Sequence, residues 1–229
     1  MNLAFTPSSE ITSLQMPHST PSSRPIVFVV DDDVSVREAL ELLIRNAGWQ
    51  PETFESARDF LAWPRPQVPS CLLLDISLPG ISGLELQKRV STERADMPII
   101  FITGHGDVPK TVEAMKAGAA EFLTKPVSSE VLLGAIRQAL ERSRIALGHA
   151  TEMQGLRSRY SSLSPRERQV MTLVVSGLLN KQVGGELGIS VITVKTHRGK
   201  VMHKMQADSL AELVNMAARL RLRLSPSKG

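Results

Sequence analysis

Acidic side chains stand directly behind two apolar runs in the N-terminal half of the sequence. Three aspartates, residues 31–33, follow the β-branched run at residues 26–30, and Asp75 follows the apolar run at residues 71–74. Each run is long enough for a buried strand and short for a helix. The Pro79–Gly80 pair breaks the chain soon after Asp75. The carboxylates therefore stand where strands are expected to end.

Two further polar residues follow expected strands in the same way: Thr103 after the apolar run at residues 98–102 and Lys125 after residues 120–124. The carboxyl ends of parallel strands share one edge, so these side chains can converge with the aspartates. Clustered carboxylates repel and call for a cation, and Mg²⁺ binds through one or two carboxylates, waters and a phosphate. Together the residues predict a pocket for a phosphoryl group, with Asp75 as its nucleophilic acceptor.

The segments between these residues predict the scaffold. A short strand is expected near residues 50–54, and helices are expected over residues 34–47, 56–62, 83–91 and 108–117 and from about residue 128. Strands that alternate with helices form a parallel sheet with helices on both faces. We expect an α/β fold with a doubly wound, five-stranded parallel sheet.

The motifs VVDDD, LLLDISLPGISG, FITG and FLTKP occur in this order, and residues 25–145 resemble the flavodoxin-like receiver domain of two-component response regulators. This resemblance implies that Asp75 is the phosphoacceptor. It also implies a Mg²⁺ ligand set, a switch and phosphate-binding set, and a cis peptide bond before Pro126. The implied ligands are Asp31 through water, Asp32, Asp75 and the Ser77 carbonyl, and the second set is Thr103, Phe122 and Lys125.

A second interpretation of the same acids is a phosphatase. The stretch FVVDDDVSV also fits the Asp-x-Asp pattern of haloacid-dehalogenase-like phosphatases, with Asp31 as nucleophile and Asp33 as acid, and Thr103 ending a later strand. That family has a further acidic cluster after its lysine, whereas a helix start follows Lys125 here. It would also leave Asp75 without a role.

The composition is that of a globular protein of 229 residues with 42% hydrophobic residues, and no apolar run approaches the length of a membrane span. Residues 1–24 are rich in Ser, Thr and Pro and lack the features of a signal peptide, so we expect a disordered tail and a cytoplasmic protein. The single cysteine, Cys71, lies in an apolar run and is expected to be a buried core residue.

Charge divides the chain into two unlike halves. Residues 1–148 contain 14 Lys and Arg against 18 Asp and Glu, a net charge of −4, and residues 149–229 contain 13 against 5, a net charge of +8. A basic C-terminal half indicates a polyanionic partner, most often nucleic acid.

The C-terminal half predicts four short helices. The first has a capping box from Ser164 to Glu167, the second begins at Asn180, and Ser190 and Ser209 cap the third and fourth. The inward face of the third helix is predicted to be Val191, Val194, Val201 and Met205. Between residues 143 and 162 we expect a helical extension that fades near Ile145 and gives way to a linker.

The third helix has a cationic face, which is typical of a helix that enters the major groove of DNA. The segment around LSPRE, NKQV, LGIS and TVKTHR closely resembles the LuxR-type DNA-binding domain over residues 157–222. Unlike that family, the scaffold helix contains Gly184 and Gly185, which we expect to weaken it. The resemblance implies base contacts from Lys195, Thr196 and Gly199 and phosphate contacts from Thr193, His197, Arg198 and Lys200.

A receiver followed by a LuxR-type helix-turn-helix domain is the NarL/FixJ arrangement of response regulators, so the chain is identified as such a regulator and not as an enzyme. The expected partners are a sensor histidine kinase, double-stranded operator DNA, RNA polymerase and, on phosphorylation, a second copy of the chain. An alternative is a DNA-binding regulator whose receiver is a constitutive dimerisation module. The expected division is a tail over residues 1–24, a receiver over 25–142, an extension and linker over 143–162 and a DNA-binding domain over 163–229.

Overall fold

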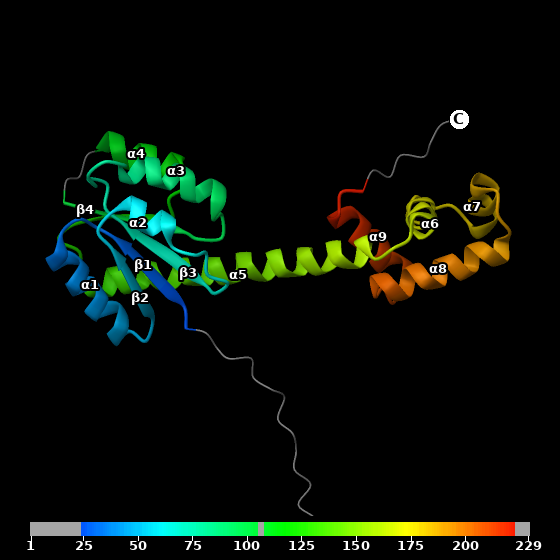
Figure 1. Ribbon diagram of the computed structural model, residues 1–229, viewed down its shortest axis with the longest axis horizontal. Coiled ribbons are helices and arrows are strands. Elements are labelled where there is room, and N and C mark those ends of the chain that lie inside the picture. Colours follow the sequence, from blue (N-terminus) through cyan, green and yellow to red (C-terminus); the bar gives the residue numbers. More distant parts are fainter. Residues whose placement is uncertain (1–23, 105–107, 223–229) are drawn as a thin grey trace, which may run out of the picture.

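The computed structural model describes residues 24–104 and 108–222, and its N-terminal part is a parallel sheet between two layers of helices (Figure 1). The sheet order is β2-β1-β3-β4-β5, and all neighbouring strands are parallel. This topology confirms the predicted doubly wound, five-stranded sheet. The strands are β1 (Ile26–Val30), β2 (Gln50–Phe54), β3 (Ser70–Leu74), β4 (Ile99–Thr103) and β5 (Glu121–Thr124).

Helices cover both faces of the sheet because successive side chains of a buried strand point to opposite sides. On one face Val27, Val29 and Leu73 pack against α1 (Val34–Asn46) and α5 (Ser129–Ser161). On the other face the alternate residues of the same strands pack against α2 (Ala57–Ala62), α3 (Gly83–Glu93) and α4 (Val108–Lys116). All five residues of β3 are buried. Cys71 is among them, as predicted, and burial raises the pKa of its thiol.

Four short helices form the C-terminal part, with the end of α5 packed into their core (Figure 1). Gly188 turns the chain between the second and third of them with a positive φ of 63°. The helix-turn-helix unit is therefore present, and this part is all-α as predicted. The helices are α6 (Pro165–Val175), α7 (Asn180–Leu187), α8 (Val191–Met205) and α9 (Leu210–Arg219).

The predicted tail over residues 1–24 lies outside the described residues except for Arg24, and so do residues 223–229 of the predicted DNA-binding domain. Across the two described stretches, no helix has both the length and the apolar character that a membrane crossing requires.

The helical pattern does not fade near Ile145, because α5 continues as one helix of 33 residues to Ser161. Gly148 and Gly155 have open space around them and do not interrupt it. Packing at both ends stabilises the helix: Leu132 and Ile136 lie in the core beside the sheet, and Leu156 lies in the core of the C-terminal helices. This anchoring offsets the cost of about 1 kcal/mol for each interior glycine.

The inward face of α8 differs from the prediction at one residue. Val194, Val201 and Met205 are buried, but Val191 is 40% exposed. Val191 is the first residue of α8, and the packed stretch of this helix begins at Val194.

Two glycines allow backbones to approach closely. A Cβ on Gly83, the first residue of α3, would stand 2.3 Å from the carbonyl oxygen of Asp75, and a Cβ on Gly184 would stand 2.8 Å from that of Ile189. By contrast, Gly185 is exposed and has open space around it. Gly185 thus only lowers the helix propensity of α7, whereas Gly184 is required for the close approach of the turn into α8.

We expect Gly83→Ala to destabilise the sheet domain by about 1–3 kcal/mol, because the added methyl group must displace the backbone at Asp75. Gly134→Ala is the matched control: this helical glycine of α5 has open space, so alanine should stabilise by up to about 1 kcal/mol. Denaturant unfolding followed by the fluorescence of the two tryptophans, Trp49 and Trp63, reports on this domain alone. Equal effects of the two substitutions would contradict the close approach.

We expect Gly185→Ala to slow hydrogen exchange of the α7 amides about fivefold, since about 1 kcal/mol of helix propensity corresponds to that factor. Gly184→Ala should accelerate exchange in α7 and in the turn at Ile189. Hydrogen exchange read by mass spectrometry over residues 180–190 separates the two variants, and slower exchange in both would show that position 184 has room for a methyl group.

Candidate functional site

Asp31, Asp75 and Lys125 meet at the carboxyl edge of the sheet, directly after β1, β3 and β5. Asp31 is 3% exposed and Asp75 is 8% exposed. The Lys125 ammonium donates a hydrogen bond of 2.8 Å to the Asp31 carboxylate, although two strands lie between β1 and β5 in the sheet. The chain therefore holds two buried carboxylates and one cation at a single edge.

The charges at this edge act on one another. Burial raises the pKa of the Asp75 carboxyl above its ordinary value, and the neighbouring Asp31 carboxylate raises it further. The positive charge of Lys125 acts in the opposite direction, as do the backbone N–H groups of Ser77 and Ile76. The Ser77 N–H donates to Asp75 Oδ2 at 3.0 Å. A cation or a phosphoryl group placed here therefore meets a carboxylate whose charge depends on its neighbours.

The three consecutive aspartates have different positions. Asp31 points into the site and accepts a hydrogen bond of 3.0 Å from the Asp33 N–H through its Oδ1. Asp32 is exposed beside it. The Asp33 side chain caps α1 by accepting from the Ser35 N–H at 2.8 Å. Asp31 therefore faces the edge that bears Asp75 and Lys125, whereas the Asp33 carboxylate is used at the start of α1.

Thr103 and Phe122 flank the site on β4 and β5. Thr103 is the last residue of β4 and is 2% exposed, and its carbonyl accepts from the Lys125 N–H at 2.7 Å. The Phe122 ring is half-buried with its centroid 6.2 Å from that of Phe101. The peptide bond between Lys125 and Pro126 is cis, as the resemblance implied.

The donor set fits Mg²⁺. Residues 24–104 and 108–222 contain no group of three or more Asp, Glu, His or Cys side chains arranged as a ready metal cage. Magnesium does not require one, because it keeps several waters and usually takes one or two carboxylates together with phosphate oxygens. Asp31 and Asp75 supply two coupled carboxylates, and the exposed Asp32 adjoins them.

Two residues that support this edge escaped the sequence analysis. Gly83 lets the first turn of α3 lie against the backbone of Asp75. The Arg37 guanidinium donates to the Asp31 carbonyl at 2.8 Å and ties α1 to the end of β1. The only sequence signal for Gly83 is a glycine directly after the helix-capping Ser82, and Arg37 is one of many charged residues on a surface helix.

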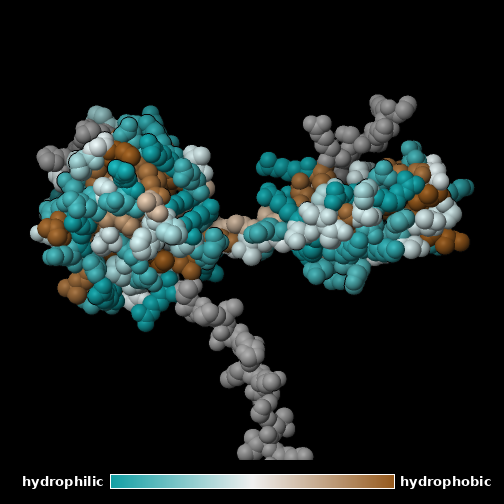
Figure 2. All heavy atoms as spheres, in the orientation of Figure 1, coloured by the Kyte–Doolittle hydropathy of each residue, from teal (hydrophilic) through white to brown (hydrophobic). Residues whose placement is uncertain are grey.

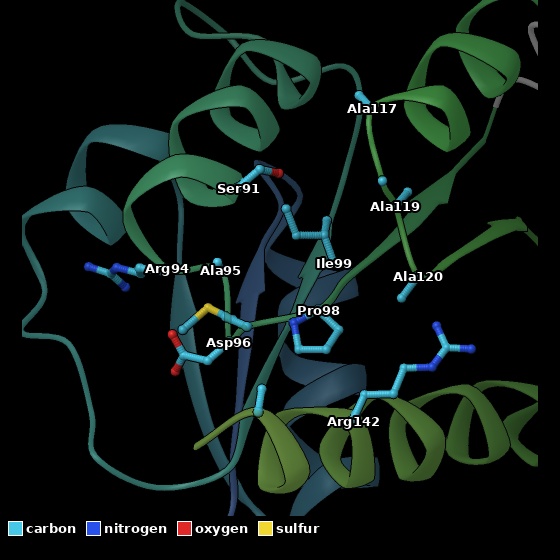
Figure 3. A pocket seen from close by; sticks show the side chains of 13 residues that line it. Ser91, Arg94, Ala95, Asp96, Pro98, Ile99, Ala117, Ala119, Ala120 and Arg142 are labelled. Carbon is cyan, nitrogen blue, oxygen red and sulfur yellow. The ribbon is translucent and has the colours of Figure 1, made fainter. Parts of the chain in front are cut away.

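A pocket of about 430 Å³ lies at the opposite edge of the sheet, where β4 and β5 begin (Figure 3). Its wall includes Pro98, Ala120 and Arg142. Arg94 also borders the pocket, but its guanidinium points away from Arg142 and lies 4.7 Å above the Phe60 ring. This pocket has no part in the acidic edge.

The cationic face of α8 is accessible. Buried Val194, Val201 and Met205 direct the helix against the core of its domain, so the remaining positions face outward or lie at the margin of the packed side. The exposed predicted residues are Lys195, Thr196, Gly199 and Lys200, and the half-buried ones are Thr193, His197 and Arg198.

Two polar contacts fix α8 within its domain. Lys204 donates to the Glu167 carboxylate at 2.8 Å, and this hydrogen bond is the main reason why the pKa of Glu167 lies below its ordinary value. Glu167 also accepts from the Ser164 N–H, so the predicted capping box is present. Arg198 donates to the Asn180 side chain at 3.1 Å at the start of α7.

Family comparisons agree with both parts of the chain. The response regulator receiver domain matches residues 27–137, and the bacterial regulatory proteins of the luxR family match residues 161–217. Nodulation protein W of Bradyrhizobium diazoefficiens is 49% identical over 89% of each chain. Transcriptional regulatory protein FixJ of the same organism is 42% identical over 84% of this chain and 94% of its own.

Among solved structures, response regulator StyR is 48% identical and superposes with a TM-score of 0.78 over 86% of this chain and 100% of its own. These matches exclude the phosphatase interpretation and confirm a regulator rather than an enzyme. The chain belongs to the response regulators of two-component systems, in the group that joins a receiver to a LuxR-type helix-turn-helix domain and regulates transcription by binding DNA.

Proposed function

We propose that Asp75 is the phosphoacceptor of this regulator. The main support is that Asp75 is a buried carboxylate whose pKa is affected by the charges of Asp31 and Lys125. These two residues form a hydrogen-bonded ion pair with each other. Within residues 24–104 and 108–222, Asp59 and Asp208 are exposed and lack the burial that Asp75 has. A phosphoryl group on Asp75 would add charge at the one place where a lysine and the proposed magnesium ligands gather.

The phosphoryl donor is a phosphohistidine of a sensor histidine kinase, the partner that membership of a two-component family implies. One oxygen of the Asp75 carboxylate attacks phosphorus, the phosphorus–nitrogen bond of the kinase breaks, and the histidine nitrogen leaves with a proton from solvent. Magnesium held by Asp32, Asp75 and the Ser77 carbonyl, and by Asp31 through water, would neutralise phosphoryl oxygens in this transfer. Lys125 would release Asp31 and pair with a phosphoryl oxygen.

The switch that follows uses β4 and β5. We propose that the Thr103 hydroxyl turns toward the phosphoryl group and that Phe122 follows, because the two residues lie on adjacent strands beside Asp75. The outer face of α4 next to them has exposed Val112 and Met115, each 45% exposed. Burial of these side chains against a second copy would create the homodimer.

The dimer would bind operator DNA in the cytoplasm and, through RNA polymerase, control transcription. Two copies of α8, about 34 Å apart, would enter successive major grooves, whereas one copy alone would bind weakly. The proposed base contacts are Lys195, Thr196 and Gly199, and the proposed phosphate contacts are Thr193, His197, Arg198 and Lys200. Net positive charge on this half of the chain supports binding to a polyanion.

We expect beryllofluoride with Mg²⁺, which imitates the phosphoryl group, to convert the wild-type chain from monomer to dimer. Asp75→Asn should stay monomeric, because it lacks the acceptor carboxylate. Asp33→Asn should respond as the wild type does, since asparagine caps a helix as well as aspartate. Light scattering measures all three. A dimer without beryllofluoride in both wild type and Asp75→Asn would favour the constitutive dimerisation module instead.

We expect Lys200→Ala to weaken binding to operator and unrelated DNA alike. It should also reduce the slope of log affinity against log salt concentration by about 1, because one phosphate contact is lost. Lys195→Ala should mainly reduce the preference for operator. Fluorescence anisotropy across a salt series separates the two effects, with Arg45→Ala in α1 as the control that removes one charge elsewhere. An unchanged slope for Lys200→Ala would refute the phosphate contact.

A further inference from the structure

The most exposed large apolar side chain of the described residues lies on the cationic helix. Ile192, in the first turn of α8, is 77% exposed, and Val191 beside it in the chain is 40% exposed; Leu179, which precedes α7, is 71% exposed. Figure 2 shows an apolar patch at the end of the small domain where α7 meets α8. None of these three side chains contributes to the two cores of the domain.

Ile192 shares one face of α8 with the residues already proposed to contact bases. Residues 192, 195, 196 and 199 follow the spacing of three, four and seven that places side chains on one side of a helix. Ile192, Lys195, Thr196 and Gly199 are all exposed. A surface that binds the Lys195 and Thr196 side chains is therefore within reach of Ile192.

The Thr196 side chain, one turn after Ile192, presents a more apolar surface than a threonine usually does. The Thr196 hydroxyl donates to the Ile192 carbonyl at 3.1 Å, so its proton is used inside the helix. Thr196 can then offer an oxygen acceptor and a methyl group to a partner. Ile192 and Thr196 together form an apolar ridge next to the Lys195 ammonium, and Gly199 leaves the next turn without a side chain.

We propose that Ile192, with the methyl group of Thr196, contacts the C5 methyl groups of thymines in the operator and so determines part of its sequence. This inference rests on the proposed function, in which α8 enters the major groove. The only apolar group that base pairs present in that groove is the thymine methyl, and a net charge of +8 in residues 149–229 favours DNA over an apolar protein surface. Burying the isoleucine against such a methyl group returns the free energy that its exposure to water costs.

The test removes one methyl group at a time from the DNA. The full-length chain, with beryllofluoride and Mg²⁺, first selects its preferred site from a random duplex library. Each thymine of that site is then replaced by uracil, which lacks only the C5 methyl group. We expect uracil at one or two positions of each half-site to weaken wild-type binding about three- to fivefold, the effect of roughly one buried methyl group.

The same uracil substitutions should have little effect on Ile192→Ala, because its contact is already lost. Leu42→Ala, which removes a 63% exposed apolar side chain from α1, should keep the full wild-type sensitivity to uracil. Circular dichroism checks that Ile192→Ala is folded, as expected for an exposed position.

The outcomes that would overturn the proposal are distinct. Wild-type binding that is insensitive to uracil at every thymine, or sensitivity that persists in Ile192→Ala, would show that Ile192 does not contact thymine methyl groups. Loss of beryllofluoride-induced dimer formation in Ile192→Ala, with no change in uracil sensitivity, would assign the side chain to a protein interface. A chain that selects no sequence from the library would contradict DNA recognition by α8 itself.

Discussion

The ion pair between Asp31 and Lys125 joins the ends of two strands that do not touch. In the sheet order β2-β1-β3-β4-β5, β3 and β4 stand between them, and Asp75 follows β3. The pair therefore closes over the end of the strand that bears Asp75. The Lys125 side chain is 28% exposed and that of Asp31 is 5% exposed, so removal of one partner should cost less than the about 3–5 kcal/mol that is typical of a fully buried pair. A group that competes for either partner acts directly on the shape of this edge.

The consequence extends along β5. Lys125 directly follows this strand, its N–H is bonded to the Thr103 carbonyl, and the Phe122 ring lies against Phe101 on the same strand pair. In the proposed switch, movement of the Lys125 side chain away from Asp31 would act on residues that pack together on β4 and β5. The route from the acidic edge to the surface of α4 would then pass through these two adjacent strands.

Much of the fold could be predicted from the sequence because buried parallel strands are short apolar runs with polar residues at their ends. The strands before Asp31, Asp75, Thr103 and Lys125 all occur where these patterns indicated. The course of α5 could not be predicted, because its continuity depends on anchors such as Leu132 and Leu156 in two separate cores. Local propensity at Gly148 and Gly155 pointed the other way.

The site itself was only partly predictable. Which side chains share a sheet edge follows from topology, but the distance between backbones does not, and so the need for glycine at residues 83 and 184 had no clear sequence signal. Similarly, Val191 has the same side chain as Val194 and fits the same helical face. Its exposure follows from where packing on α8 begins, which the periodicity of the helix cannot indicate.

Because α5 is continuous, the number of residues between the two domains sets both their distance and their relative rotation about the helix axis. Residues 148–151 of α5 are all exposed and form roughly 6 Å of helix between the two packed ends. Each residue inserted there would turn everything beyond it by about 100° and advance it by about 1.5 Å, whereas seven residues would restore the orientation to within roughly 20°. Substitutions in this stretch are therefore tolerated far more easily than a change of its length, because the number of residues in the helix sets the orientation of one domain relative to the other.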